Sequence, residues 1–254
     1  MKIFIKTKSS LKFNRKHLKA EKCKQLCLIS DEIAMSNSEN IGQFVFDDYE
    51  IVDKVYDYKT NFKAVAYKKE DEIVICFVGT DSKSFKDHVA NLRMGVGKTS
   101  QQMLKACGFT ELIKNNYPHY SIISSGHSEG GSEAIYVGLS YGLSTYTYNA
   151  FAISKSIMLE AIKNNSSNNK DYLINNYRDA HDPVSKLFYE DIGNTYIVES
   201  TQSVFMAKTP FGCKAAHSLK NMGNCENAIP VKIYCREHPL FINKIGKVTS
   251  VLTN

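Results

Sequence analysis

The most constraining feature of this 254-residue chain is a short glycine-containing segment, residues 126–131, that joins a strand pattern directly to a helix pattern. Residues 120–125 are typical of a short strand, and residues 129–141 are typical of a helix. A turn this tight crowds the residues two positions before and after Ser128, and glycine at positions 126 and 130 relieves that crowding. The sequence therefore predicts a strand that runs straight into a helix, which is a building unit of α/β proteins.

The same alternation of strands and helices extends along most of the chain. Residues 63–67 and 73–78 flank a polar connection and predict a β-hairpin. The helical pattern that follows stops before Pro118. We therefore expect an α/β fold with a mostly parallel central sheet and helices on both faces. The other predicted elements are helices at 99–116 and 153–163, a surface loop at 164–169, and strands at 145–151, 172–177, 195–200 and 231–235.

A basic segment precedes this pattern. Nine lysines and arginines lie before residue 25, and residues 15–36 favour a helix. We predict that residues 1–40 form a basic, mostly helical N-terminal extension and that residues 41–254 form one domain. A solvated lysine-rich face is one interpretation, and peripheral contact with an anionic membrane surface is the other. Aromatic residues are too sparse there to favour nucleic-acid binding, so we expect none.

Composition restricts the setting in which the chain works. No run of 18 apolar residues is present, so we expect no transmembrane segment. Lysines interrupt every apolar run near the N-terminus, which leaves no signal-peptide core. The expected location is therefore the cytoplasm, or outside it after export without a Sec signal peptide. Seven scattered cysteines without a CxxC pair predict free thiols.

The strand–turn–helix segment also carries the chemistry. Gly126-His127-Ser128-Glu129-Gly130 fits the pattern G-x-S-x-G, in which a serine sits on a sharp turn. The helix that follows directs its free N–H groups and its positive end toward Ser128. We therefore predict that Ser128 is a nucleophile.

A serine needs a base to take its proton and an acid to orient that base. In this fold class the chain order is serine, then acid, then histidine. The candidate acids are Asp182, Asp179 and Asp191, and Asp182 is favoured because it follows a predicted strand and precedes usable histidines. The candidate bases are His217 and His238.

Negative charge that develops on the substrate oxygen also needs donors. One backbone N–H comes from the residue after the nucleophile, which is Glu129 here, and another comes from the loop after an early strand. Thr80 follows the strand that ends near Phe77, so we expect Thr80 and Glu129 to form the oxyanion hole.

These motifs, in this order, resemble the class 3 lipases over about residues 62–222. The resemblance is carried by residues 77–82, Asn91, Tyr117-Pro118, residues 126–131 and Asp182-Pro183-Val184. It implies the α/β-hydrolase fold and hydrolysis of acylglycerol or phospholipid esters without cofactor or metal. It also implies Ser128 as nucleophile, Asp182 as acid, His217 as base, and Thr80 with Glu129 as oxyanion donors.

The chain departs from that family at three points. Val78 stands where the family usually has arginine, Glu129 stands where it usually has leucine, and the tryptophan after the oxyanion loop is missing because the chain has no tryptophan. These changes bear on the substrate more than on the mechanism. The alternatives are an esterase, thioesterase or acyltransferase that acts on a non-lipid substrate, and a non-catalytic binding module on a hydrolase scaffold.

Overall fold

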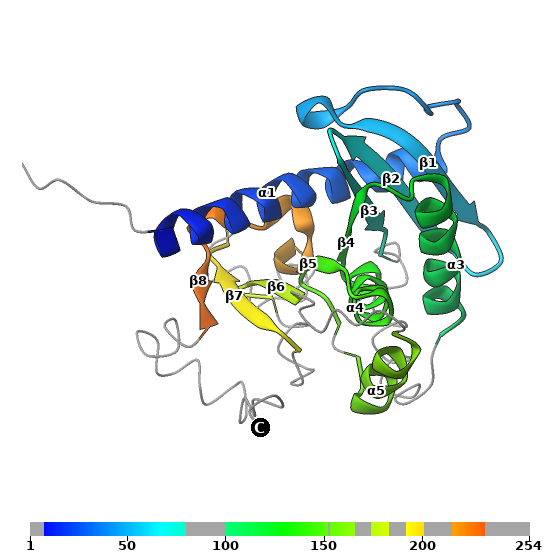
Figure 1. Ribbon diagram of the computed structural model, residues 1–254. Helices are drawn as coiled ribbons and strands as arrows, with labels where there is room; N and C mark the ends of the chain where they lie inside the picture. Colours follow the sequence, from blue (N-terminus) through cyan, green and yellow to red (C-terminus); the bar gives the residue numbers. More distant parts are fainter. Residues whose placement is uncertain are drawn as a thin grey trace, which may run out of the picture.

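A computed structural model describes residues 8–79, 100–151, 153–165, 174–182, 192–200 and 215–231. Its centre is an eight-stranded sheet whose strands lie side by side in chain order (Figure 1). Strands β3 to β7 are parallel, whereas β1, β2 and β8 run antiparallel to their neighbours. The strands are β1 (Glu50–Asp57), β2 (Phe62–Lys69), β3 (Glu72–Phe77), β4 (Ser121–His127), β5 (Ser144–Tyr148), β6 (Ile174–Asp179), β7 (Asn194–Val198) and β8 (Ile229–Pro230).

Helices cover both faces of this sheet. Strand β3 illustrates the division, because Val74 and Cys76 face the core beneath α1, while Ile73, Ile75 and Phe77 face the core beneath α3 and α4. After Glu72 at its start, the side chains from Ile73 to Phe77 are all apolar because both faces of the strand are buried there. The helices are α1 (Lys8–Met35), α3 (Gln101–Asn116), α4 (Glu129–Tyr141) and α5 (Lys155–Asn164), with short 3-10 turns η1 (Phe46–Asp48), η3 (Leu219–Asn221) and η4 (Cys225–Asn227).

The predicted α/β architecture is confirmed. The hairpin of β2 and β3 and the helix α4 lie where the sequence predicted them. The sequence analysis missed β1, because charged residues at positions 50, 53, 54 and 57 hide its apolar residues. Strand β5 ends at Tyr148, three residues before the predicted end. The predicted strand at 231–235 lies outside the described residues except for Val231.

Helix α1 docks on the sheet through tyrosine hydroxyls as well as through apolar packing. Ala20, Cys23 and Leu26 lie on the face of α1 that packs against the sheet and are fully buried. Four strands each present a tyrosine whose hydroxyl bonds to α1. These pairs are Tyr67 with Ser30, Tyr148 with the Ala20 carbonyl, Tyr177 with His17 Nδ1 at 2.9 Å, and Tyr196 with Lys16 Nζ at 2.7 Å. Buried tyrosines need such partners, so this row of hydroxyls determines where α1 can lie.

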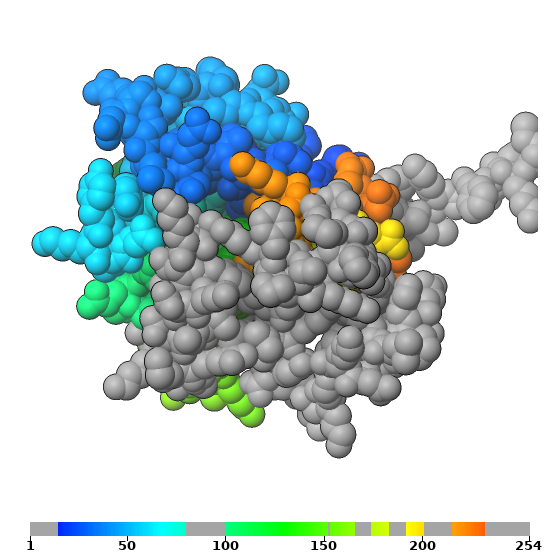
Figure 2. Space-filling view, turned by 180° about the vertical axis from the view of Figure 1, so that it is seen from behind, coloured from blue at the N-terminus to red at the C-terminus, as the bar shows by residue number. Residues whose placement is uncertain are grey.

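The lysines of α1 whose side chains the structure describes are engaged with the rest of the fold. Lys19 pairs with Glu72 at 2.6 Å, and Lys22 pairs with Asp47 at 2.5 Å. Lys24 is buried, pairs with Glu21 at 2.9 Å and donates to the Gly223 carbonyl. Figure 2 shows the orange segment that contains Gly223 lying against the blue helix. The division at residue 40 stays a prediction, but residues 15–35 supply one layer of the sheet's core.

The buried His17 predicts a loss of stability in acid. Burial and the neighbouring Lys16 lower the pKa of His17 to about 4 from its usual 6.5. The unfolded chain therefore binds a proton that the folded chain excludes, and stability decreases as pH falls from about 6.5 to 4. Urea unfolding of His17→Phe across this range should show a weaker pH dependence than the unmodified protein. The exposed His119 is the control, and an equal flattening by His119→Phe would contradict the assignment.

The pair Glu21–Lys24 predicts a second effect on stability. Lys24→Met leaves the partly buried carboxylate of Glu21 without its cation, which should lower the free energy of unfolding by about 3 kcal/mol. Lys22→Met removes a pair that is about one third exposed and should cost less than about 1 kcal/mol. Urea unfolding of both variants at neutral pH measures the difference, and equal losses would show that the burial of Lys24 is unimportant.

Candidate active site

Ser128 occupies the sharp turn between β4 and α4. Its φ of 58° and ψ of −123° lie in a region that residues with a side chain rarely adopt. Three main-chain hydrogen bonds hold this conformation. The Ser128 N–H donates to the Tyr148 carbonyl at 3.1 Å, and the Ser128 carbonyl accepts from Gly131 and Phe151. The strained turn therefore belongs to the scaffold formed by β4, β5 and α4.

The two glycines of the motif are required by close backbone contacts. A Cβ atom at Gly126 would lie 2.2 Å from the Gly130 carbonyl oxygen. A Cβ atom at Gly130 would lie 2.2 Å from the carbonyl oxygen of Phe77, at the end of β3. Real Cβ atoms do not approach backbone this closely, so only glycine lets the first turn of α4 pack against the ends of β3 and β4.

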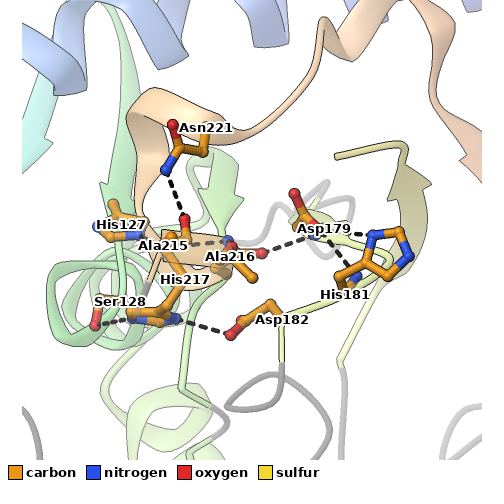
Figure 3. Close-up of polar contacts among 10 residues, drawn as sticks. His127, Ser128, Asp179, His181, Asp182, Ala215, Ala216, His217 and Asn221 are labelled. Atoms are coloured by element: carbon orange, nitrogen blue, oxygen red, sulfur yellow. Dashed lines mark hydrogen bonds and ion pairs between the residues drawn. The ribbon is translucent and has the colours of Figure 1, made fainter. Parts of the chain in front are cut away.

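The structure brings together Ser128, His217 and Asp182. His217 Nε2 lies 2.8 Å from Ser128 Oγ, and His217 Nδ1 lies 3.1 Å from Asp182 Oδ1 (Figure 3). Only 6% of Ser128, 5% of His217 and none of Asp182 is exposed, so these contacts are shielded from bulk water. Serine, imidazole and carboxylate in this order can pass a proton from the hydroxyl to the ring and stabilise the resulting imidazolium.

Each of the three residues comes from a different part of the sheet. Asp182 follows β6 by three residues, and His217 lies in a helical turn at residues 215–217 that leads into η3. The Phe151 ring stacks on the His217 ring, with centroids 5.9 Å apart and an interplanar angle of 11°. The carboxyl ends of parallel strands meet at one edge of the sheet, which explains how Asp182, 54 positions away from Ser128, reaches it.

The rival acid Asp179 is used elsewhere. Its carboxylate accepts the His181 backbone N–H at 2.8 Å (Figure 3). Its own backbone N–H donates to Asn149 Oδ1 at 2.8 Å. Asp191 and His238 lie outside the described residues.

The predicted oxyanion donors are described only in part. Glu129 is the first residue of α4, beside Ser128. Thr80 lies outside the described residues, but Gly79 precedes it and packs closely on the turn. A Cβ atom at Gly79 would lie 2.6 Å from the His127 carbonyl oxygen and 3.5 Å from the Glu129 nitrogen.

Two further residues at the site were missed by the sequence analysis. His127 Nε2 lies 2.8 Å from the His217 carbonyl oxygen, and Asn149 Nδ2 lies 3.3 Å from the same oxygen. Burial lowers the pKa of His127 to about 3, so its ring is neutral. The signals were a histidine inside the G-x-S-x-G motif and an asparagine just after β5. The predicted strand 145–151 extended through Asn149 and obscured its role.

The described residues contain no cluster of three His, Cys, Asp or Glu side chains that suits a metal ion. Among them there is also no helix that is long and apolar enough to cross a bilayer. All five described cysteines are free thiols, as predicted.

Comparison with solved structures places this fold among the lipases of the α/β-hydrolase class. The lipase from Rhizopus microsporus var. chinensis matches with a TM-score of 0.57 at 15% identity, covering 83% of this chain and 90% of that chain. Lipase II from Rhizopus niveus matches with a TM-score of 0.58 at 14% identity, covering 83% and 97%. A triacylglycerol lipase whose catalytic centre is formed by a serine protease triad matches at 0.52 and 16%, covering 86% and 98%.

Comparison with protein families identifies the group more closely. Residues 45–224 match the Tle-like phospholipase domain, and this match covers more than half of the chain. The chain therefore belongs to this phospholipase-like family, and the predicted lipase or phospholipase relationship is confirmed. The protein is a carboxylic ester hydrolase that acts on lipids. No curated protein matches the sequence.

The glycine contacts predict a clear difference between two substitutions. Gly126→Ala places a methyl group against the Gly130 carbonyl, so it should displace the turn and abolish esterase activity. It should also lower the free energy of unfolding by about 1–3 kcal/mol. Gly108→Ala on α3 meets no atom within 4 Å and should stabilise the helix by about 0.5–1 kcal/mol. Thermal unfolding and esterase assays of both variants test this, and an active, stable Gly126→Ala protein would contradict it.

Proposed function

We propose that this protein is a phospholipase that hydrolyses the carboxylic ester bonds of phospholipids, with Ser128 as nucleophile, His217 as base and Asp182 as acid. The observation that carries the proposal is the continuous contact from Ser128 Oγ through the His217 ring to Asp182 Oδ1.

In this mechanism the Ser128 hydroxyl attacks the ester carbonyl while His217 Nε2 accepts its proton. The tetrahedral intermediate then expels the alcohol, the lysophospholipid, as His217 returns the proton to the leaving oxygen. A water molecule, deprotonated by His217, then attacks the acyl-enzyme carbonyl. The fatty acid leaves as His217 returns this proton to Ser128 Oγ. Asp182 accepts the Nδ1 proton of His217 in a hydrogen bond, which keeps Nε2 unprotonated in the resting state and stabilises the imidazolium during each step.

We infer that the backbone N–H groups of Thr80 and Glu129 bind the oxyanion. Two facts support this assignment. Glu129 begins α4 directly after Ser128, and Gly79, the residue before Thr80 in the sequence, packs closely on the same turn. Preorganised donors of this kind contribute to catalysis because they are aligned before charge develops.

Phospholipids are preferred over acylglycerols in this proposal because the family is phospholipase-like, whereas the similar solved structures are named as lipases. The purified protein should release fatty acid from phosphatidylcholine vesicles faster than from a triolein emulsion. Faster hydrolysis of triolein would reject the phospholipid preference and leave the ester chemistry intact. Activity on short soluble thioesters alone would favour the non-lipid alternative.

Contact with an anionic membrane surface stays a prediction. The net charge of +6 supports it, but Lys16, Lys19, Lys22 and Lys24 are engaged within the fold. A membrane contact would therefore depend on other basic residues. The absence of nucleic-acid binding, and the choice between the cytoplasm and export without a Sec signal peptide, also stay predictions.

The assignment of the acid is tested by two matched aspartates. Asp182→Asn should lower kcat by about 10⁴, because the amide favours the wrong tautomer of His217. Asp179→Asn should change kcat less than about tenfold, since the Asp179 carboxylate accepts the His181 backbone N–H and the substitution leaves the Asp179 backbone N–H bonded to Asn149 Oδ1. Ser128→Ala should lower kcat by about 10⁶ and remove labelling by a fluorophosphonate probe.

Hydrolysis rates on a soluble ester, together with circular dichroism to confirm folding, measure these effects. A reversed order of the two aspartate variants would assign the acid to Asp179. A folded wild-type protein that neither reacts with the probe nor hydrolyses esters would favour the binding-module alternative.

A further inference from the structure

We propose that His127 and Asn149 are positioning residues that hold the catalytic base His217 by its main-chain carbonyl. The inference rests on the proposed role of His217 as base. Both side chains bond to the main-chain carbonyl of His217, so both act through its backbone.

The turn that carries the nucleophile contacts His217 at two points. Ser128 and His127 are consecutive, and both contact the same residue. Ser128 Oγ lies 2.8 Å from the ring nitrogen Nε2 of His217, and His127 Nε2 lies 2.8 Å from its carbonyl oxygen. The nucleophile's own turn therefore holds both ends of the base. Because φ and ψ at Ser128 are held by three hydrogen bonds, the distance between nucleophile and base is set by one rigid turn.

The side chain of Asn149 bridges the backbones of His217 and Asp179. Its side-chain Nδ2 donates to the His217 carbonyl, while its Oδ1 accepts the Asp179 backbone N–H at 2.8 Å. Asn149 is completely buried and has a φ of 45°, a conformation that asparagine tolerates better than most residues. Asn149 thereby connects the segment that carries the acid to the turn that carries the base.

The ring of His127 is neutral. Its ring must carry a proton on Nε2 to donate to the carbonyl, and its burial keeps the ring otherwise uncharged. The rings of His127 and His217 are only 5.0 Å apart. A neutral donor can therefore hold the carbonyl without opposing the positive charge that His217 gains during the reaction.

The consequence concerns the precision of catalysis. His217 lies in a single helical turn, 35 residues beyond Asp182, rather than in a long helix or a strand. A displacement of about 1 Å in a reacting group can cost about 10²-fold in rate. The hydrogen bonds from His127 and Asn149 to the His217 carbonyl fix the position of His217, which a single helical turn alone would not.

A matched pair of variants at position 127 tests this proposal. His127→Phe keeps a flat ring but removes the donor, whereas glutamine places an amide N–H near the position of the histidine Nε2. We expect His127→Phe to lower kcat for a soluble ester by about 10–100-fold with little change in KM. His127→Gln should recover most of that loss. In both variants the acidic limb of the pH–rate profile should keep its apparent pKa, since His127 does not titrate in that range.

A double-mutant cycle tests whether both donors act on one carbonyl. Asn149→Asp keeps the acceptor for the Asp179 N–H and loses the donor to His217. If both side chains act through the same oxygen, the double variant His127→Phe with Asn149→Asp should lose less kcat than the product of the two single losses. Losses that multiply would overturn the shared role.

Stability and the proposed function are separated by two controls. Thr110→Val on α3 removes a buried hydrogen bond far from the base and should lower stability without changing kcat of the folded enzyme. His217→Ala should be inactive if the proposed function is correct. An inactive His217→Ala together with a fully active His127→Phe would overturn the positioning role alone, and so would equal damage by phenylalanine and glutamine at position 127. An active His217→Ala would overturn the proposed function as well.

Discussion

The close approach of the first turn of α4 to the ends of β3 and β4 is the constraint on which the rest of the site depends. Backbone atoms of Gly126, Gly130 and Phe77 meet where any Cβ would collide, and this contact forces Ser128 to a φ of 58°. The strained serine is stable only because Tyr148, Gly131 and Phe151 each add a main-chain hydrogen bond. Strain at one residue is thus balanced by packing that involves three strands and a helix.

The parallel order of β3 to β7 then supplies the remaining groups. Successive strands end at the same edge, so the residues that follow β5 and β6 lie beside the turn that follows β4. Asn149 follows β5, and Asp182 follows β6. The base arrives differently, on a turn beyond β7, and its backbone is bonded to His127 and Asn149. Elements of the sheet determine where the acid and nucleophile lie, whereas side-chain hydrogen bonds locate the base.

Much of this arrangement was predictable from the sequence, for identifiable reasons. Helix α4 and the β2–β3 hairpin were predicted because their patterns are local and are bounded by glycine or polar residues. The convergence of Ser128, Asp182 and His217 followed from motif order in the fold class, and their catalytic roles stay proposals. The positions of His127 and Asn149 against the His217 carbonyl were not predictable, because that contact depends on the path of a chain segment 68 to 90 residues away. No local pattern encodes a long-range backbone acceptor.

Helix α1 is a second case in which local sequence patterns do not reveal long-range partners. Its lysines follow no apolar motif, so the sequence left a solvated basic face and contact with an anionic membrane surface as the two interpretations. In the fold, the charges of Lys19, Lys22 and Lys24 are met by Glu72, Asp47 and Glu21, and Lys16 bonds to the Tyr196 hydroxyl. Glu21 also accepts the Cys225 backbone N–H at 2.8 Å, and Lys24 donates to the Gly223 carbonyl. These two bonds hold the chain that leaves the His217 turn. Only a few residues therefore separate His217 from the segment that Glu21 and Lys24 hold against α1. Breaking the Glu21–Lys24 ion pair would release this segment and so affect the geometry of the site.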